Sequence, residues 1–298
     1  MKRILFLLML MIVLAGCNNT EQPTTIPQAT IPQAQVTAEP TPTVAVAEPT
    51  AAVQPTEPAA PPPPTSAPTA TAAPEAPPPG QEAILIQEPG PGWRLTSPIH
   101  VSGMADSTFE QNLVVRLLLD DGTELALVPT TIAAELGQRG PFEVDIPFTV
   151  SGERQAFLQV YATSARDGGI THLSSVGLTI ADSGEENRPP FDLMTNERII
   201  IAEPVLNAAV SGGVVYVEGI ATASFEQTLV VEILDESGTV IGSEPVIVNA
   251  PELGEPGAFQ VVLPYTAGVT GAARVVVRDI SPAFGGDVHV ASVEIRLE

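Results

Sequence analysis

Residues 109–119 read FEQNLVVRLLL, and residues 225–234 read FEQTLVVEIL. In the first stretch an apolar side chain recurs at every second position from Leu113 to Leu119, whereas Arg116 falls on the other parity. Successive side chains of a β-strand point to opposite faces, so this period of two predicts a strand with one buried face. The near-identity of the two stretches also predicts an internal repeat.

The repeat extends outward in both directions from this stretch. ILIQEP at residues 84–89 corresponds to IIIAEP at residues 199–204. A Gly-Gly pair followed by a histidine occurs at residues 168–172 and again at residues 285–289. The offset between equivalent positions stays between 115 and 117 residues, so the loops of the two copies differ in length by about two residues.

Each copy contains about seven short alternating runs, separated by turn signals such as Asp120-Asp121-Gly122. Seven short strands in about 100 residues are typical of an immunoglobulin-like β-sandwich. We therefore predict an all-β fold with two tandem sandwiches at residues 83–182 and 198–298, joined by a linker at residues 183–197. The single cysteine excludes the disulfide of an antibody domain.

The segment that precedes the repeats has a different composition. Residues 18–82 hold 17 of the 31 prolines, with many Thr and Ala and few large apolar side chains. Such a segment cannot bury a core and is typical of an extended spacer. We predict a disordered Pro-rich stalk over residues 17–82.

The N-terminus has the pattern of a signal peptide. Lys2 and Arg3 precede an apolar run of 11 residues, Ile4 to Leu14. This run is too short to span a bilayer, which takes about 20 residues, but it suits a signal-peptide core over residues 1–16.

The sequence Leu-Ala-Gly-Cys at residues 14–17 resembles the lipobox of bacterial lipoproteins. The resemblance implies cleavage before Cys17, the only cysteine, and attachment of a diacylglycerol to its thiol. Two acyl chains are enough for lasting attachment to a membrane. We therefore predict a cell-membrane lipoprotein, lipidated at Cys17, that faces the extracytoplasmic side.

The repeats resemble a known family of domains. The shared motifs are Ile-x-Ile-x-x-Pro at residues 84–89, Val101-x-Gly103-x-Ala105, Phe109 with its following glutamate, and a late Gly-Gly loop. Together they resemble the immunoglobulin-like domain of bacterial spore germination and sporulation lipoproteins. The resemblance implies two such sandwiches and a role connected with germination or sporulation.

Composition and motifs restrict the remaining function classes. A formal net charge of −23 argues against nucleic acid as an electrostatic partner. We predict no catalytic residue, no cofactor and no metal site, because no motif of the required spacing occurs. His172 and His289 are equivalent in the two copies and are expected to be hydrogen-bonded at the edge of each core. His100 has no counterpart in the second copy.

Two further expectations concern the ends and faces of the sandwiches. Phe109 and Phe225 are expected to fill one end of each core. On one strand near the end of each copy, the side chains that are expected to point away from the core differ between the copies. This difference is compatible with either a binding face or a solvent-exposed face whose sequence is not constrained. These residues are Phe157, Gln159 and Tyr161 in the first copy, and Arg274, Val276 and Arg278 in the second.

These patterns favour a non-enzymatic surface lipoprotein. Its tandem domains would bind an extracellular protein or a cell-wall component. The alternatives are an accessory subunit of a cell-envelope enzyme, or an enzyme in its own right such as a wall hydrolase.

Overall fold

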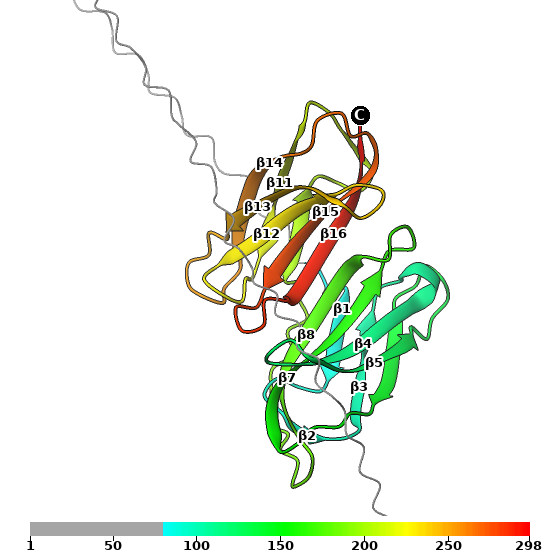
Figure 1. Ribbon diagram of the computed structural model, residues 1–298, viewed down its shortest axis with the longest axis vertical. Coiled ribbons are helices and arrows are strands. Elements are labelled where there is room, and N and C mark those ends of the chain that lie inside the picture. The colour runs from blue at the N-terminus through cyan, green and yellow to red at the C-terminus, as the bar shows by residue number, and fades with distance from the viewer. Residues whose placement is uncertain (1–79) are drawn as a thin grey trace, which may run out of the picture. The chain divides into compact units, whose positions relative to one another are not determined.

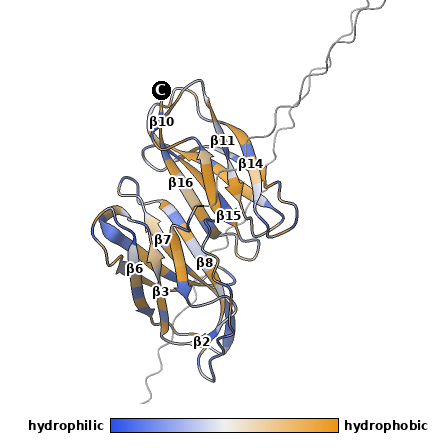
Figure 2. Ribbon diagram, turned by 180° about the vertical axis from the view of Figure 1, so that it is seen from behind, coloured by the Kyte–Doolittle hydropathy of each residue, from blue (hydrophilic) through white to orange (hydrophobic). Residues whose placement is uncertain are grey.

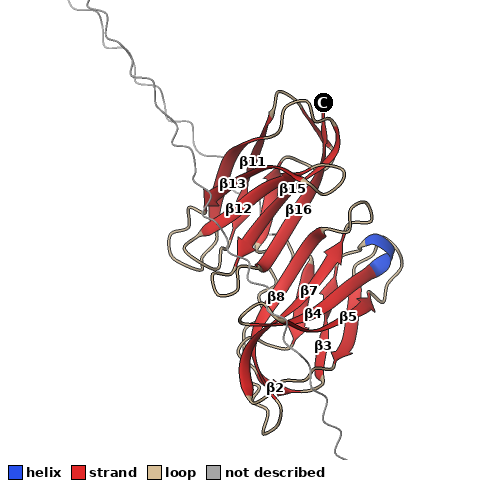
Figure 3. Ribbon diagram, viewed as in Figure 1, coloured by secondary structure: helices blue, strands red, loops and turns tan. Residues whose placement is uncertain are grey.

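A computed structural model describes residues 80–298. The predicted signal peptide, Cys17 and almost all of the predicted stalk lie outside the described residues. Within the described part, strands account for nearly all regular structure, with one short 3-10 helix, η1 (Phe109–Gln111) (Figure 3). The predicted all-β fold with two immunoglobulin-like domains is confirmed. No helix in residues 80–298 has the length and apolarity needed to cross a membrane.

The first repeat is a sandwich of two sheets. One sheet has the order β1-β3-β6, and the other has the order β5-β4-β7-β8, with β2 pairing parallel to β8. The strands are β1 (Ile84–Glu88), β2 (Arg94–Thr96), β3 (Ile99–Ala105), β4 (Asn112–Leu119), β5 (Glu124–Thr131), β6 (Gly140–Ile146), β7 (Glu153–Thr163) and β8 (Ile170–Ala181).

The second repeat has the same architecture. Its sheets have the orders β9-β11-β14 and β13-β12-β15-β16, and β10 pairs parallel to β16 as β2 does to β8. The strands are β9 (Ile199–Glu203), β10 (Ala208–Val210), β11 (Val214–Ala221), β12 (Thr228–Leu234), β13 (Val240–Ile247), β14 (Gly257–Pro264), β15 (Gly271–Ile280) and β16 (Asp287–Leu297).

Each sandwich buries its own apolar core, as the period of two predicts. Val115 and Leu117 of β4 are fully buried, and so are their equivalents Val231 and Ile233 of β12. Figure 2 shows the apolar residues gathered in the strands of both repeats. Removal of this apolar surface from water is the main term that stabilises each sandwich.

The repeated Val-x-Gly-x-Ala motif has a steric cause. Gly103 lies on β3 opposite Ile86 of the paired strand β1, and a Cβ atom there would overlap the carbonyl oxygen of Leu85 and crowd the ring of Phe142. Gly219 on β11 has the same position against Ile200 and Phe259. Only glycine allows the two backbones this approach.

Segments predicted as stalk and linker contact the first sandwich. The N–H of Glu82 donates to the carbonyl of Thr195 at 2.8 Å, so the last predicted stalk residues pair with the linker. Further along, Trp93 Nε1 donates to the carbonyl of Pro189 at 2.9 Å. The Phe191 ring packs edge-on against Trp93, with centroids 5.9 Å apart. The segment between the repeats is therefore held in place by specific contacts.

The two larger sheets join at their edges. Edge strand β8 of the first repeat pairs antiparallel with β16 of the second, with Leu173 opposite Val290 and Ser174 opposite His289 (Figure 1). Because β8 and β16 are equivalent strands, the pairing relates the repeats as in a symmetric dimer interface. Pairing also covers part of the edge that β8 and β16 would otherwise expose.

Candidate functional site

The loop that joins β7 to β8 in the first repeat packs on the second repeat. Asp167 of this loop accepts two hydrogen bonds from Arg274 Nη2, at 3.0 and 3.2 Å. Both side chains are buried, with exposures of 0% and 1%. Burial acts to raise the pKa of Asp167, but the N–H of Gly169 and the charge of Arg274 outweigh it, so the pKa of this carboxyl is lowered.

The equivalent loop of the second repeat packs on the first. Phe284, in the loop between β15 and β16, places its ring 4.8 Å from the ring of Phe157. Nearby, Gln159 Nε2 donates to the carbonyl of Asp287 at 2.6 Å. Four side chains between these contacts form a small buried apolar cluster: Tyr161, Leu173, Val276 and Val290.

These contacts correct the expectation of a free binding or solvent face. Gln159, Arg274 and Val276 have the outward parity in their sheets, but each is buried between the repeats. Arg278, also in this set, pairs with Asp287 and Glu232 at 2.7 and 3.1 Å. Gln159 and Arg274 therefore contact the other repeat, through Asp287 and Asp167 respectively, whereas Arg278 is paired within its own repeat.

Four titratable side chains meet where the repeats join: Glu82, His172, Glu197 and His289, here called the junction cluster. His172 Nε2 lies 3.1 Å from Glu82 Oε1 and 3.7 Å from Glu197 Oε1. His289 Nε2 lies 3.1 Å from Glu197 Oε1 and 3.8 Å from Glu82 Oε1. Each repeat supplies one histidine, and the residue just before each repeat supplies one glutamate, all from equivalent positions.

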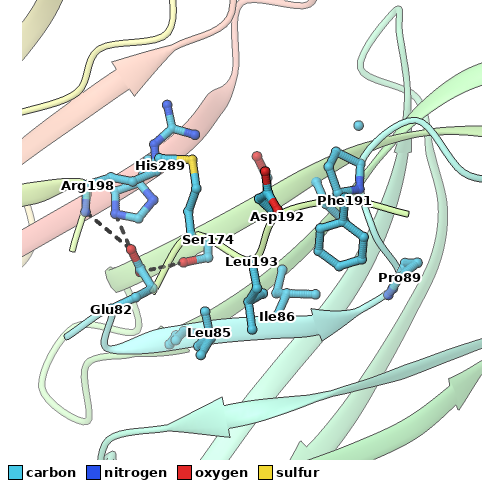
Figure 4. A pocket seen from close by; sticks show the side chains of 16 residues that line it. Glu82, Leu85, Ile86, Pro89, Ser174, Phe191, Asp192, Leu193, Arg198 and His289 are labelled. Carbon is cyan, nitrogen blue, oxygen red and sulfur yellow. Dashed lines mark hydrogen bonds and ion pairs between the residues drawn. The ribbon is translucent and has the colours of Figure 1, made fainter. Parts of the chain in front are cut away.

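Backbone groups fix both carboxylates of the junction cluster. The N–H of Ala83 donates to Glu197 Oε2 at 2.9 Å, and the equivalent N–H of Arg198 donates to Glu82 Oε2 at 3.2 Å. The arrangement is reciprocal, because each glutamate accepts a hydrogen bond from the N–H of the residue that follows the other glutamate. Both Oε1 atoms are consequently left to face the two imidazoles, and Ser174 Oγ donates to that of Glu82 at 2.8 Å (Figure 4).

The charges of the junction cluster favour ionised carboxylates. Burial raises the pKa of Glu82, but the hydrogen bond from His172 and the charges of His289 and His172 outweigh burial and lower it to about 2. Burial lowers the pKa of His172, but the hydrogen bond to Glu82 and the charge of Glu197 outweigh it, so this pKa is raised. Imidazole and carboxylate thus stabilise each other's charged forms.

The junction cluster borders a pocket of about 280 Å³. Glu82, Ser174 and His289 line one end, and Phe191 and Leu193 of the linker line another part (Figure 4). Although serine, histidine and glutamate are all present, their order does not fit a hydrolase triad. Glu82 stands between Ser174 and His172, whereas a triad places the histidine between the nucleophile and the carboxylate. The donor set is instead one that can coordinate a cation.

The sequence singled out the two histidines of this cluster, as hydrogen-bonded residues at the edge of each core. His172 and His289 are hydrogen-bonded, as expected, and His100 lies apart in an exposed pair with Asp145 at 2.9 Å. The partners Glu82 and Glu197 were missed. The repeat could have identified them as candidate site residues, because the two glutamates occupy equivalent positions just before the Ile-x-Ile motifs.

The expectation for the repeated phenylalanines is wrong. Phe109 and Phe225 do not fill the cores, since their exposures are 59% and 46%. In each copy the two residues that follow have left-handed backbone, with φ of 53° and 57° at Glu110 and Gln111. This turn directs Phe109 outward and buries Gln111, whose Nε2 donates to three carbonyls of the loop at residues 134–138.

A family described as the immunoglobulin-like domain of bacterial spore germination matches residues 83–169 and 198–286. The chain belongs to this family. Its two germination-type immunoglobulin-like domains are the two tandem copies that the sequence predicts. Residues 1–18 match the prokaryotic membrane lipoprotein lipid attachment site, so this germination-domain protein carries a site for attachment to a membrane by lipid.

Solved structures show only distant likeness to the tandem domains. Red sea bream transglutaminase matches at 9% identity and a TM-score of 0.27, over 74% of this chain and 31% of that one. Dimeric latent PorU from Porphyromonas gingivalis matches at 13% identity and a TM-score of 0.27, over 77% of this chain and 21% of that one. A chimeric titin Z1Z2-Z1Z2 tandem matches at 14% identity and a TM-score of 0.21, over 72% of this chain and 97% of that one. No curated protein matches the chain.

Proposed function

We propose that the chain is a non-enzymatic lipoprotein, acylated at Cys17, whose tandem domains bind another protein on the extracytoplasmic side of the membrane. The match at residues 1–18 supports the anchor. Within this proposal, residues 17–82 are the stalk that separates residues 83–182 and 198–298 from the lipid. The family supports a role connected with germination.

The observation that carries the binding proposal is a strained turn that exposes an aromatic ring in both copies. Glu110 and Gln111 are left-handed, and so are Glu226 and Gln227, with φ of 45° and 54°. Such backbone costs a non-glycine residue about 1–3 kcal/mol and is concentrated at functional positions. Its presence in both copies beside an exposed phenylalanine favours a role in contact.

A second exposed apolar side chain accompanies each phenylalanine. Leu136 and its equivalent Leu253 have exposures of 75% and 76%. In the first repeat the Leu136 loop is tied to the Phe109 turn, because Gln111 Nε2 donates to the carbonyls on both sides of Leu136. Aromatic side chains such as phenylalanine are enriched in protein interfaces. The net charge of −23 disfavours anionic wall polymers as the partner.

Photocrosslinking in intact cells tests this proposal. We expect a photoreactive amino acid at position 109 or 225 to give a discrete protein adduct, which Leu136→Asp weakens at position 109. The matched control is position 143, an exposed residue in the middle of β6. Equal labelling at all three positions, or an adduct that wall-degrading enzymes remove, would contradict the proposed protein partner.

A further inference from the structure

The junction cluster has the composition of a metal site, and its role is separate from partner binding at the exposed turns. We propose that Glu82, His172, Glu197 and His289 together bind one Zn²⁺ ion, which links the two repeats. The proposal rests on the spacing of the four ligand atoms, on their chemistry and on how they are held.

The spacing matches a tetrahedral ion. Zn²⁺ with bonds of about 2.1 Å holds its four ligand atoms about 3.4 Å apart. The four nitrogen-to-oxygen separations in the junction cluster are 3.1, 3.1, 3.7 and 3.8 Å, which lie on both sides of that value. All four ligand atoms lie within 4.8 Å of one another. Shifts of a few tenths of an ångström would equalise these four nitrogen-to-oxygen separations.

The donor atoms select the class of ion. Two imidazole nitrogens and two carboxylate oxygens suit Zn²⁺, whereas Ca²⁺ and Mg²⁺ take oxygen ligands almost entirely. Charge favours a divalent ion. Two carboxylates balance a divalent ion when both imidazoles are neutral, so the bound site buries no net charge.

The ligands are held before any ion arrives. The N–H groups of Ala83 and Arg198 fix the outer oxygens of Glu197 and Glu82 at 2.9 and 3.2 Å. Hydrogen bonds of this kind orient ligands in known metal sites and strengthen binding. The His172 and His289 rings stand nearly perpendicular, at 85°, with centroids 5.3 Å apart.

The site needs both repeats. His172 comes from the first copy and His289 from the second, Glu82 and Glu197 directly precede the two copies, and β8 pairs with β16 beside them. The pocket of about 280 Å³ that reaches Glu82 and His289 provides a route for a hydrated ion. An ion there would act as a clamp on the pairing of the repeats, because a metal that binds only the folded arrangement stabilises it.

Metal titration of the full-length lipoprotein in detergent, after treatment with a chelator, tests the proposal. We expect calorimetry to show one Zn²⁺ bound per chain, together with a rise in Tm. Replacement of Zn²⁺ by Co²⁺ should give the intense visible absorption bands of tetrahedral coordination. His289→Gln and Glu197→Gln should each weaken Zn²⁺ binding by at least about 100-fold, since each removes a ligand.

His100→Gln is the matched control, because His100 is exposed and belongs to a pair outside the cluster. It should leave stoichiometry and affinity unchanged. The proposal is overturned if the wild-type chain binds no stoichiometric Zn²⁺, since the cluster is then only a set of ion pairs. It is also overturned if Co²⁺ gives an octahedral spectrum, or if His100→Gln weakens binding as much as the cluster variants. Wild-type stoichiometry and the Co²⁺ spectrum decide the matter even where a variant does not fold.

Discussion

Asp167→Ala is expected to destabilise the folded part of the chain by about 3–5 kcal/mol, which is the usual cost of breaking a buried ion pair from one side. Asp167 is the anion that Arg274 meets across the two repeats, and both side chains are buried. Without it, the nearest remaining carboxylate oxygen is Glu294 Oε1, 3.6 Å from Arg274 Nη1. Urea unfolding followed by circular dichroism measures the change.

Two matched variants distinguish the effect of an unpaired buried charge on Arg274 from the effect of removing a carboxylate side chain. Adding Arg274→Met to Asp167→Ala removes the unpaired cation and should restore most of the stability. Asp145→Ala removes an exposed partner of His100 and should be close to neutral. If Asp167→Ala proves as mild as Asp145→Ala, the repeats are not held together by this contact.

Phe142→Ala is expected to cost about 3–5 kcal/mol, because a buried aromatic side chain is replaced by a cavity. Phe142 on β6 is 2% exposed and packs beneath Gly103 in the first core. Phe109→Ala, by contrast, should change the free energy of unfolding by less than about 0.5 kcal/mol, since this ring is mostly in solvent.

The contrast between the two phenylalanines is measured by thermal unfolding of both variants alongside the photocrosslinking assay. Phe142→Ala should lower Tm, whereas Phe109→Ala should leave Tm in place. If both turns contact one partner, Phe109→Ala should also weaken crosslinking from position 225. A large fall in Tm for Phe109→Ala would place this side chain in the core after all.

Local sequence patterns predicted the architecture, because they reflect interactions between residues that are close together in the chain. The alternation from Leu113 to Leu119 specifies one buried face, and the Val101-x-Gly103-x-Ala105 motif marks a close approach of the paired strands β1 and β3. Repetition of these patterns established two copies of one domain. The same reasoning gave the lipid attachment site at the N-terminus.

Contacts between the copies were beyond this reasoning. Parity shows that Gln159 and Arg274 point away from their own cores, but it does not show that the other repeat covers them. Asp167 and Arg274 are 107 positions apart, and Gln159 and Asp287 are 128 apart, with no motif to link them. The outward turn at Phe109 was also hidden, because left-handed backbone at Glu110 and Gln111 has no glycine to signal it.

The central claim is that the two repeats form one unit through their paired edges, their exchanged loops and the junction cluster. Differential scanning calorimetry of the full-length lipoprotein tests it most directly. We expect one transition for both sandwiches, with calorimetric and van't Hoff enthalpies in agreement, and we expect Asp167→Ala to split that transition in two. Two separate transitions in the wild-type chain, unaffected by Asp167→Ala, would show two independent domains and contradict the account.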